Sequence, residues 1–224
     1  MPSRNYGIDA LRILAMYMVV ILHVLGCGGI LESATVGSVN YYGVWLLETA
    51  AYCAVDVFAM ISGYVMISAK FNVFRIIPLW LTVFFYSALI TLLFCFVPFL
   101  TIIHAVSTKE LISRIFLPVT SGTYWYFTSY FALFFFIPFI NTLLLSLSKK
   151  QHFSLCATII TLFSLMPVLG LKHFDIFSMN WGYSAWWLIS LYVIGAYLKV
   201  YPVTISKRKC IFLYFLSILV AWLS

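Results

Sequence analysis

Two ionisable side chains, Arg12 and His23, lie eleven positions apart in the apolar run GIDALRILAMYMVVILHVLG (7–26). Eleven residues advance an α-helix by about three turns, so both side chains leave nearly the same face, about 16 Å apart along the axis. Asp9 lies one turn before Arg12 and is expected to pair with it. A histidine with its ordinary pKa of about 6.5 suits proton transfer, and a guanidinium binds anions. We expect this polar line to face protein and not lipid.

The next apolar run carries a second polar group. Glu48, Tyr52 and Asp56 are spaced i, i+4, i+8, which predicts one stripe on a continuous helix. Glu48 is expected at the outer boundary in contact with water, whereas Asp56 lies deeper and either orients His23 or pairs with an arginine. Ionisable residues inside membrane helices cost about 2.5–3.5 kcal/mol on insertion scales and are functional candidates. A single structural hydrogen bond to a neighbouring helix is the alternative for His23.

The composition places these residues in a membrane protein. Of 224 residues, 64% are hydrophobic and 8% charged, whereas a soluble chain is near a quarter charged. We predict an all-α polytopic bundle with seven membrane spans, and a single domain (1–224) that is cut short within its last helix, because the last run is short for a span. The predicted spans are about 8–30, 44–69, 76–100, 124–147, 153–171, 185–201 and 210–224.

The charge distribution predicts how the chain is oriented. A net charge of +7 does not indicate nucleic acid here, because the basic residues form short clusters between apolar runs, as in cytoplasmic loops. With the N-terminus inside, ten of the thirteen basic residues lie on the inner side. This bias predicts a cytoplasmic N-terminus in a multi-pass protein of the plasma membrane. The five cysteines lack a C-x-x-C spacing, so neither a metal site nor a disulfide framework is predicted.

Five segments, taken in order, resemble the type-3 acyltransferase family of integral-membrane enzymes. Arg12 and His23 match its R-x(10)-H signature, and the opening run is similar to its first helix. The other segments are VDVFAMISGYVM (55–66), FRIIPLW (74–80), TYWYFTSYFALFFFIPFI (123–140) and LYVIGAYL (191–198). Members commonly have more spans than this chain. The family's basic motif before the third span is reduced here to Lys70 and Arg75.

The resemblance implies transfer of an acyl group, usually acetyl, from cytoplasmic acyl-coenzyme A to a hydroxyl of a cell-surface glycan or lipid-linked saccharide. It implies His23 as the general base. Asp56, from its position in the second apolar run, is the second candidate catalytic residue. The cations Arg12, Lys70 and Arg75 suit the phosphates of the acyl-CoA donor. The side chains expected to line the substrate cavity are Tyr64, Trp125 and Tyr126.

Two other readings compete with acyl transfer. A transporter or flippase for a small polar or saccharide substrate would also contain buried Arg, His and Asp. Inverted repeats or a pair of broken helices would favour it, and the sequence shows neither. The other reading is a truncated, inactive relative of the enzymes. The outer loops do not select among peptidoglycan, capsule, lipid-linked sugar and secondary metabolite as acceptor, and no pattern indicates a metal, a flavin or an oligomeric state.

Overall fold

The computed structural model describes residues 4–96, 107–117, 119, 124–169 and 175–223. Helices dominate these ranges and no strand occurs in them, which confirms the all-α prediction. The longer helices are α1 (Tyr6–Gly26), α3 (Val39–Ala51), α4 (Ala54–Met66), α5 (Ile76–Phe96), α6 (Thr108–Phe116), α7 (Trp125–Ser146), α8 (Lys149–Ile160), α10 (Ala185–Val200) and α11 (Lys207–Leu223). The short segments are α2 (Ile30–Ser33), η1 (Val73–Arg75), η2 (Thr161–Leu165), α9 (Met166–Leu169) and η3 (Asn180–Gly182).

Five helical segments are long and apolar enough to cross a membrane. They are Tyr6–Gly26, Val39–Met66, Val73–Phe96, Trp125–Ser146 and Lys149–Leu169. The shorter apolar helix α10 and helix α11 occupy the other two predicted spans. The end of the third predicted span, 97–100, and the last residues of the fifth and seventh lie outside the described residues. The count of seven spans and the cytoplasmic N-terminus stay predictions.

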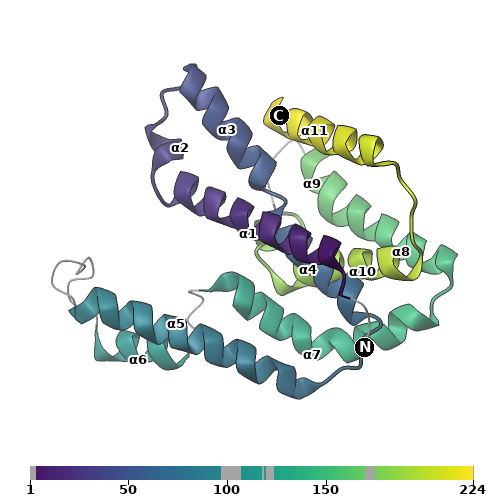
Figure 1. Ribbon diagram of the computed structural model, residues 1–224, viewed down its shortest axis with the longest axis horizontal. Helices are drawn as coiled ribbons and strands as arrows, with labels where there is room; N and C mark the ends of the chain where they lie inside the picture. The colour runs from purple at the N-terminus through teal and green to yellow at the C-terminus, as the bar shows by residue number, and fades with distance from the viewer. Residues whose placement is uncertain (1–3, 97–106, 118, 120–123, 170–174, 224) are drawn as a thin grey trace. The chain divides into compact units, whose positions relative to one another are not determined.

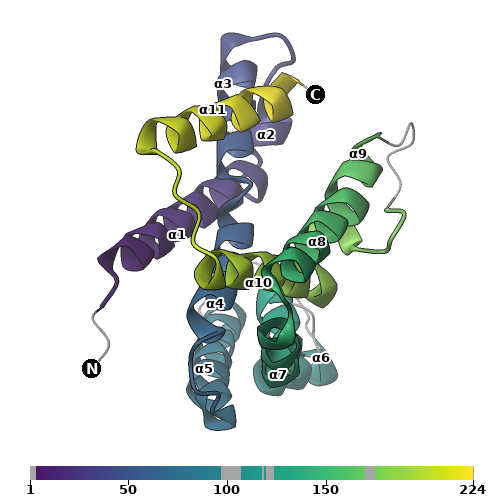
Figure 2. The same cartoon turned by 90° about the vertical axis from the view of Figure 1, so that its right-hand side faces the viewer.

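The chain divides into two compact units, each described by itself. The terminal unit comprises Met1–Val65 and Ile194–Ser224, and the central unit comprises Met66–Val193. In the terminal unit, α1 contacts α2 and α3, and α11 crosses α3, as Figures 1 and 2 show. Helix α1 begins where the Asn5 side chain accepts hydrogen bonds from the Gly7 and Ile8 amides, which would otherwise lack partners in the first turn.

The second predicted span is broken. Helix α3 ends at Ala51, a turn follows at Tyr52 and Cys53, and α4 begins at Ala54. The last carbonyls of a helix need partners from elsewhere, and the Tyr214 hydroxyl of α11 donates a 2.9 Å hydrogen bond to the Ala50 carbonyl. The predicted polar stripe at residues 48, 52 and 56 therefore spans this turn, and its three members differ in burial. Glu48 is buried, Tyr52 is exposed and Asp56 is half-buried.

The final part of α10 packs closely on α4 in the terminal unit. Gly195 permits this approach, because a Cβ atom at that position would lie 2.0 Å from the Met60 carbonyl oxygen. Close backbone approach at small residues is a common way for membrane helices to associate. The contact fixes α4, which carries Asp56 and Tyr64.

The core of the central unit contains a polar network. The buried Asn141 of α7 donates from its amide nitrogen to the Met66 carbonyl (3.0 Å) and accepts from the Tyr192 hydroxyl of α10 (2.7 Å). The fully buried His152, in the first turns of α8, contacts the Val193 carbonyl through Nε2 (3.1 Å). Buried polar side chains of this kind usually have such partners, since an unpaired one is costly. The network ties α7 and α8 to α10.

Two further features of the central unit concern its helices. Helix α6 lies along α5 (Figure 1), where the Ser87 hydroxyl donates to the Arg114 carbonyl (2.6 Å) and the Phe84 and Phe116 rings are 5.8 Å apart. Helices α8 and α9 continue as one rod through a π-helical turn, η2 (Figures 1 and 2).

Candidate functional site

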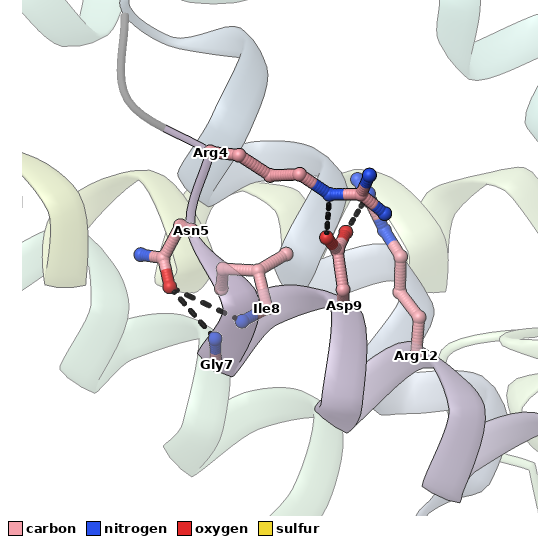
Figure 3. A network of polar contacts seen from close by, with 6 residues as sticks. All are labelled: Arg4, Asn5, Gly7, Ile8, Asp9 and Arg12. Atoms are coloured by element: carbon pink, nitrogen blue, oxygen red, sulfur yellow. Dashed lines mark hydrogen bonds and ion pairs between the residues drawn. The ribbon is translucent and has the colours of Figure 1, made fainter.

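The carboxylate of Asp9 is shared by two arginines at the start of α1 (Figure 3). Arg4 Nε donates to Asp9 Oδ2 at 2.6 Å, and Arg12 Nη1 lies 3.6 Å from Oδ1. The predicted pairing of Asp9 with Arg12 is confirmed. The hydrogen bond to Asp9, followed by the charge of that carboxylate, raises the pKa of Arg4 above its ordinary value. Arg12 is the more loosely held of the two, and its side chain is 46% exposed, so its guanidinium has donors for another anion.

The imidazole of His23 is oriented by its own helix. Its Nδ1 lies 2.8 Å from the Val19 carbonyl oxygen, one turn earlier. A carbonyl oxygen only accepts hydrogen bonds, so Nδ1 carries the proton, and in the neutral ring Nε2 carries the free lone pair. The Val19 carbonyl was not among the partners expected for His23 from the sequence. The ring borders an open hollow whose other lining residues are Val19, Val20, Val24, Cys27, Gly28 and Ile30.

Arg12 and His23 lie on one face of α1, as predicted, because the helix is uninterrupted from Tyr6 to Gly26. Both side chains are exposed, however, whereas the buried residues of α1 are Ala15 and Leu25. By the 100° rotation per residue of an α-helix, the polar line runs about 110° away from this buried face. The expected burial of both groups inside the bundle is therefore not seen. They flank the packed side of α1.

Asp56 and Tyr64 both belong to α4 in the terminal unit. The break after α3 places Asp56 in the first turn of α4, where the positive end of the helix dipole favours a carboxylate. The ring of Tyr64 lies 5.0 Å below the ammonium of Lys199, a cation–π contact. The contact places a positive charge beside this predicted site residue.

Lys70 and Arg75 lie together in the central unit, just before α5. With Phe71, Asn72 and Val73 they line a second open hollow, and both cations are exposed. The Asn72 side chain accepts a hydrogen bond from the Phe74 amide (3.0 Å), which caps the helical turn η1 that ends at Arg75. This arrangement presents two positive charges from an ordered turn, as an anion-binding site requires.

Trp125 and Tyr126, the remaining predicted site residues, open α7 in the central unit. Their rings are 5.6 Å apart, and Trp125 also contacts the Tyr183 ring at 4.5 Å. Tyr126 stacks with Tyr130 one turn later, at 6.3 Å. Both predicted residues are half-buried, so they belong to an aromatic cluster with one side open.

The site predicted from the sequence is thus divided between the two units. The terminal unit holds Arg12, His23, Asp56 and Tyr64, and the central unit holds Lys70, Arg75, Trp125 and Tyr126. Within the described ranges, no three His, Cys, Asp or Glu side chains gather as metal ligands would.

Sequence reasoning misjudged one acidic residue. Glu48 is only 6% exposed, so the expectation that water solvates it at the outer boundary is wrong. The helices α1 and α11 both contact α3 in the terminal unit. The position of Glu48 within an apolar run was the signal in the sequence that this residue is unusual, since a carboxylate is rare in a membrane helix.

The chain was compared with known families, curated proteins and solved structures. The family model described as an acyltransferase domain, of the type-3 acyltransferases, matches residues 5–224. None of the curated proteins and none of the solved structures matches the chain. The match covers nearly the whole sequence, including Arg12, His23 and all the other predicted site residues. The chain therefore belongs to the type-3 acyltransferase family and is a membrane enzyme that transfers acyl groups.

Proposed function

We propose that the protein is a plasma-membrane O-acyltransferase. It takes an acyl group, most simply acetyl, from acyl-coenzyme A on the cytoplasmic side and passes it to a hydroxyl of a cell-surface or lipid-linked glycan. Family membership supports acyl transfer over the transport alternative. The observation that carries the proposal is the His23 Nδ1 hydrogen bond to the Val19 carbonyl, because it leaves the Nε2 lone pair for catalysis.

The proposed reaction uses His23 as general base and then as general acid. Nε2 takes the proton of the acceptor hydroxyl while the hydroxyl oxygen attacks the thioester carbonyl carbon. A C–O bond forms and the carbonyl oxygen becomes an oxyanion. When this intermediate collapses, the C–S bond breaks and the imidazolium returns its proton to the coenzyme A sulfur. The products are an ester of the acceptor and free coenzyme A.

The donor is held by cations in this proposal. Arg12, with donors beyond its 3.6 Å contact to Asp9, binds one anionic group of coenzyme A. Lys70 and Arg75, on either side of the ordered turn at Asn72, bind others. Tyr64, Trp125 and Tyr126 remain candidates for lining the acyl and acceptor space. Asp56 remains the proposed carboxylate partner of the catalytic histidine, and the Val19 carbonyl holds the Nδ1 side of the imidazole ring.

The test is a comparison of two α1 variants of the full chain. His23→Ala removes the base and should lower the rate of acetyl transfer about a hundredfold to ten-thousandfold. Tyr17→Ala is the matched control, because Tyr17 is also exposed on α1 (65%) but lies on another face, and it should keep the rate within about twofold. The assay follows free coenzyme A thiol released from acetyl-CoA and acetate ester on the extracted envelope glycan.

Two outcomes would count against the proposal. A His23→Ala protein that acetylates glycan as fast as the Tyr17→Ala control would show that His23 is not the base. A wild-type protein that consumes no acetyl-CoA in the presence of envelope glycan, while moving saccharide across vesicles, would point to transport.

A further inference from the structure

Two buried polar atoms on α3 have no role in the reaction described above. Glu48 Oε2 and Trp45 Nε1 are both buried, and neither has a hydrogen-bond partner in the part of the chain that the structure describes. Glu48 as a whole is only 6% exposed. The two residues are three positions apart, so they lie on the same side of the helix about one turn apart. A buried acceptor beside a buried donor, both unsatisfied, is costly and indicates that something else supplies the hydrogen bonds.

The local backbone does not supply them. The Trp45 carbonyl already accepts from the Thr49 hydroxyl at 2.8 Å, and the Ala50 carbonyl accepts from the Tyr214 hydroxyl at 2.9 Å. The intrahelical hydrogen bonds of α3 occupy its other central amides. The missing partner of each side chain must therefore come from outside this helix.

Helix α11 frames the two side chains at both ends. Two hydrogen bonds join α11 to α3. The Trp222 indole donates to the Tyr42 carbonyl at 3.3 Å, and the Tyr214 hydroxyl donates to the Ala50 carbonyl. The earlier residue of α3 pairs with the later residue of α11, and the later residue of α3 pairs with the earlier one, so the two helices run in opposite directions. The two helices are in contact, and Figure 1 shows α11 running back toward the start of α3. Along α3, Trp45 and Glu48 fall between Tyr42 and Ala50, whose carbonyls accept these two hydrogen bonds.

The chemistry of the two atoms selects the ligand. An anion such as a coenzyme A phosphate would be repelled by the Glu48 carboxylate. A cation would satisfy Glu48 but offers no acceptor to the Trp45 N–H. A hydroxyl group satisfies both, since it donates its proton to the carboxylate and accepts from the indole.

Aromatic rings next to this pair extend the match to a sugar. The Tyr41 ring lies 6.2 Å from that of Trp45, and the Tyr42 ring lies 5.6 Å from Tyr41 and 5.9 Å from Trp222. Flat apolar rings with a few fixed polar groups are typical of sites for neutral polar ligands. We propose that Trp45 and Glu48 bind a hydroxyl of the saccharide acceptor. This inference rests on the proposed function and names the side chains that recognise its acceptor.

The test measures acceptor and donor separately. Glu48→Gln removes the charge and one acceptor oxygen, and Trp45→Phe removes only the N–H while keeping a ring. Leu47→Ala is the control, because Leu47 is 45% exposed on the same helix. The full chain is assayed with labelled acetyl-CoA and, as the probe, the water-soluble saccharide fraction from the envelope of the source cells. Each of the two variants should raise the KM for saccharide about tenfold or more, with no matching rise in the KM for acetyl-CoA, since a hydrogen bond to the acceptor is lost.

The outcomes separate this inference from the proposed function. If wild type transfers acetyl to saccharide and both variants keep the saccharide KM of the Leu47→Ala control, the pair holds only a water molecule and the inference is wrong. A purely structural role would instead lower the thermal midpoint and change both KM values together, which also overturns it. If wild type transfers no acetyl to saccharide at all, the proposed function fails, and this inference fails with it.

Discussion

Replacing Gly195 by alanine is expected to force the end of α10 away from α4. The added Cβ would lie 2.0 Å from the Met60 carbonyl oxygen, 2.7 Å from the carbonyl carbon and 2.8 Å from Cα. Optimal contact between such atoms needs about 3.5 Å, so the backbones must separate by more than about 1 Å. The obstructing atoms belong to the backbone and cannot rotate aside, which places the cost near the upper end of overpacking, about 3 kcal/mol.

A matched control exists on α3. Gly43 is also helical, and a Cβ there would meet no atom within 4 Å. Alanine in a helix interior is favoured over glycine by about 0.5–1 kcal/mol, a gain that both variants share. Gly43→Ala should therefore stabilise the protein by about that amount, while Gly195→Ala should destabilise it by about 2 kcal/mol net.

The assay is the thermal midpoint of unfolding in lipid nanodiscs, followed by tryptophan fluorescence. A difference of about 3 kcal/mol between the variants corresponds to roughly 6–12 °C for a chain of this size. Gly195→Ala should also lose acyl-transfer activity, because α4 carries Tyr64 and Asp56. Equal midpoints for the two variants would refute the close approach of α10 to Met60.

Three further substitutions follow from the described contacts. Tyr192→Phe leaves the buried Asn141 oxygen without its 2.7 Å hydrogen bond, so the free energy of unfolding should fall by about 1–3 kcal/mol; an unchanged thermal midpoint would contradict the network. Tyr214→Phe removes the partner of the carbonyl at the end of α3, and hydrogen exchange at the α3–α4 turn should accelerate, whereas exchange as slow as in wild type would show that the turn does not depend on α11. The double variant Lys70→Gln, Arg75→Gln should raise the KM for acetyl-CoA and reduce its dependence on salt; a wild-type salt dependence would exclude these cations from donor binding.

Much of the fold followed from the sequence. Long apolar runs can be stable in a bilayer only as helices or closed barrels, because backbone polar groups find no water there. Helical periodicity then placed Arg12 and His23 on one face, and the continuous α1 confirms this. The family was also accessible from short ordered motifs, and the match to residues 5–224 agrees with it.

The turn within the second span could not be predicted from the sequence. The run around Tyr52 and Cys53 is apolar and contains no proline, so local propensity gives no reason for a helix to stop there. The carbonyls at the end of α3 need a donor, and one of them obtains it from Tyr214, more than 160 positions later. Contacts this distant in sequence depend on which helices pack together.

By itself, the sequence determined the membrane class, the helical fold, the family and the shared face of Arg12 and His23, because composition and a fixed helical period decide them. Only the tertiary structure decided that Glu48 is buried and that α4 starts anew before Asp56. The burial of a side chain depends on which other helices pack over it. In a run of apolar residues, the sequence does not distinguish a position at the membrane boundary from one in the protein interior. The tautomer of His23 also needed coordinates, because the rotamer of this side chain determines that Nδ1 donates a hydrogen bond to the Val19 carbonyl.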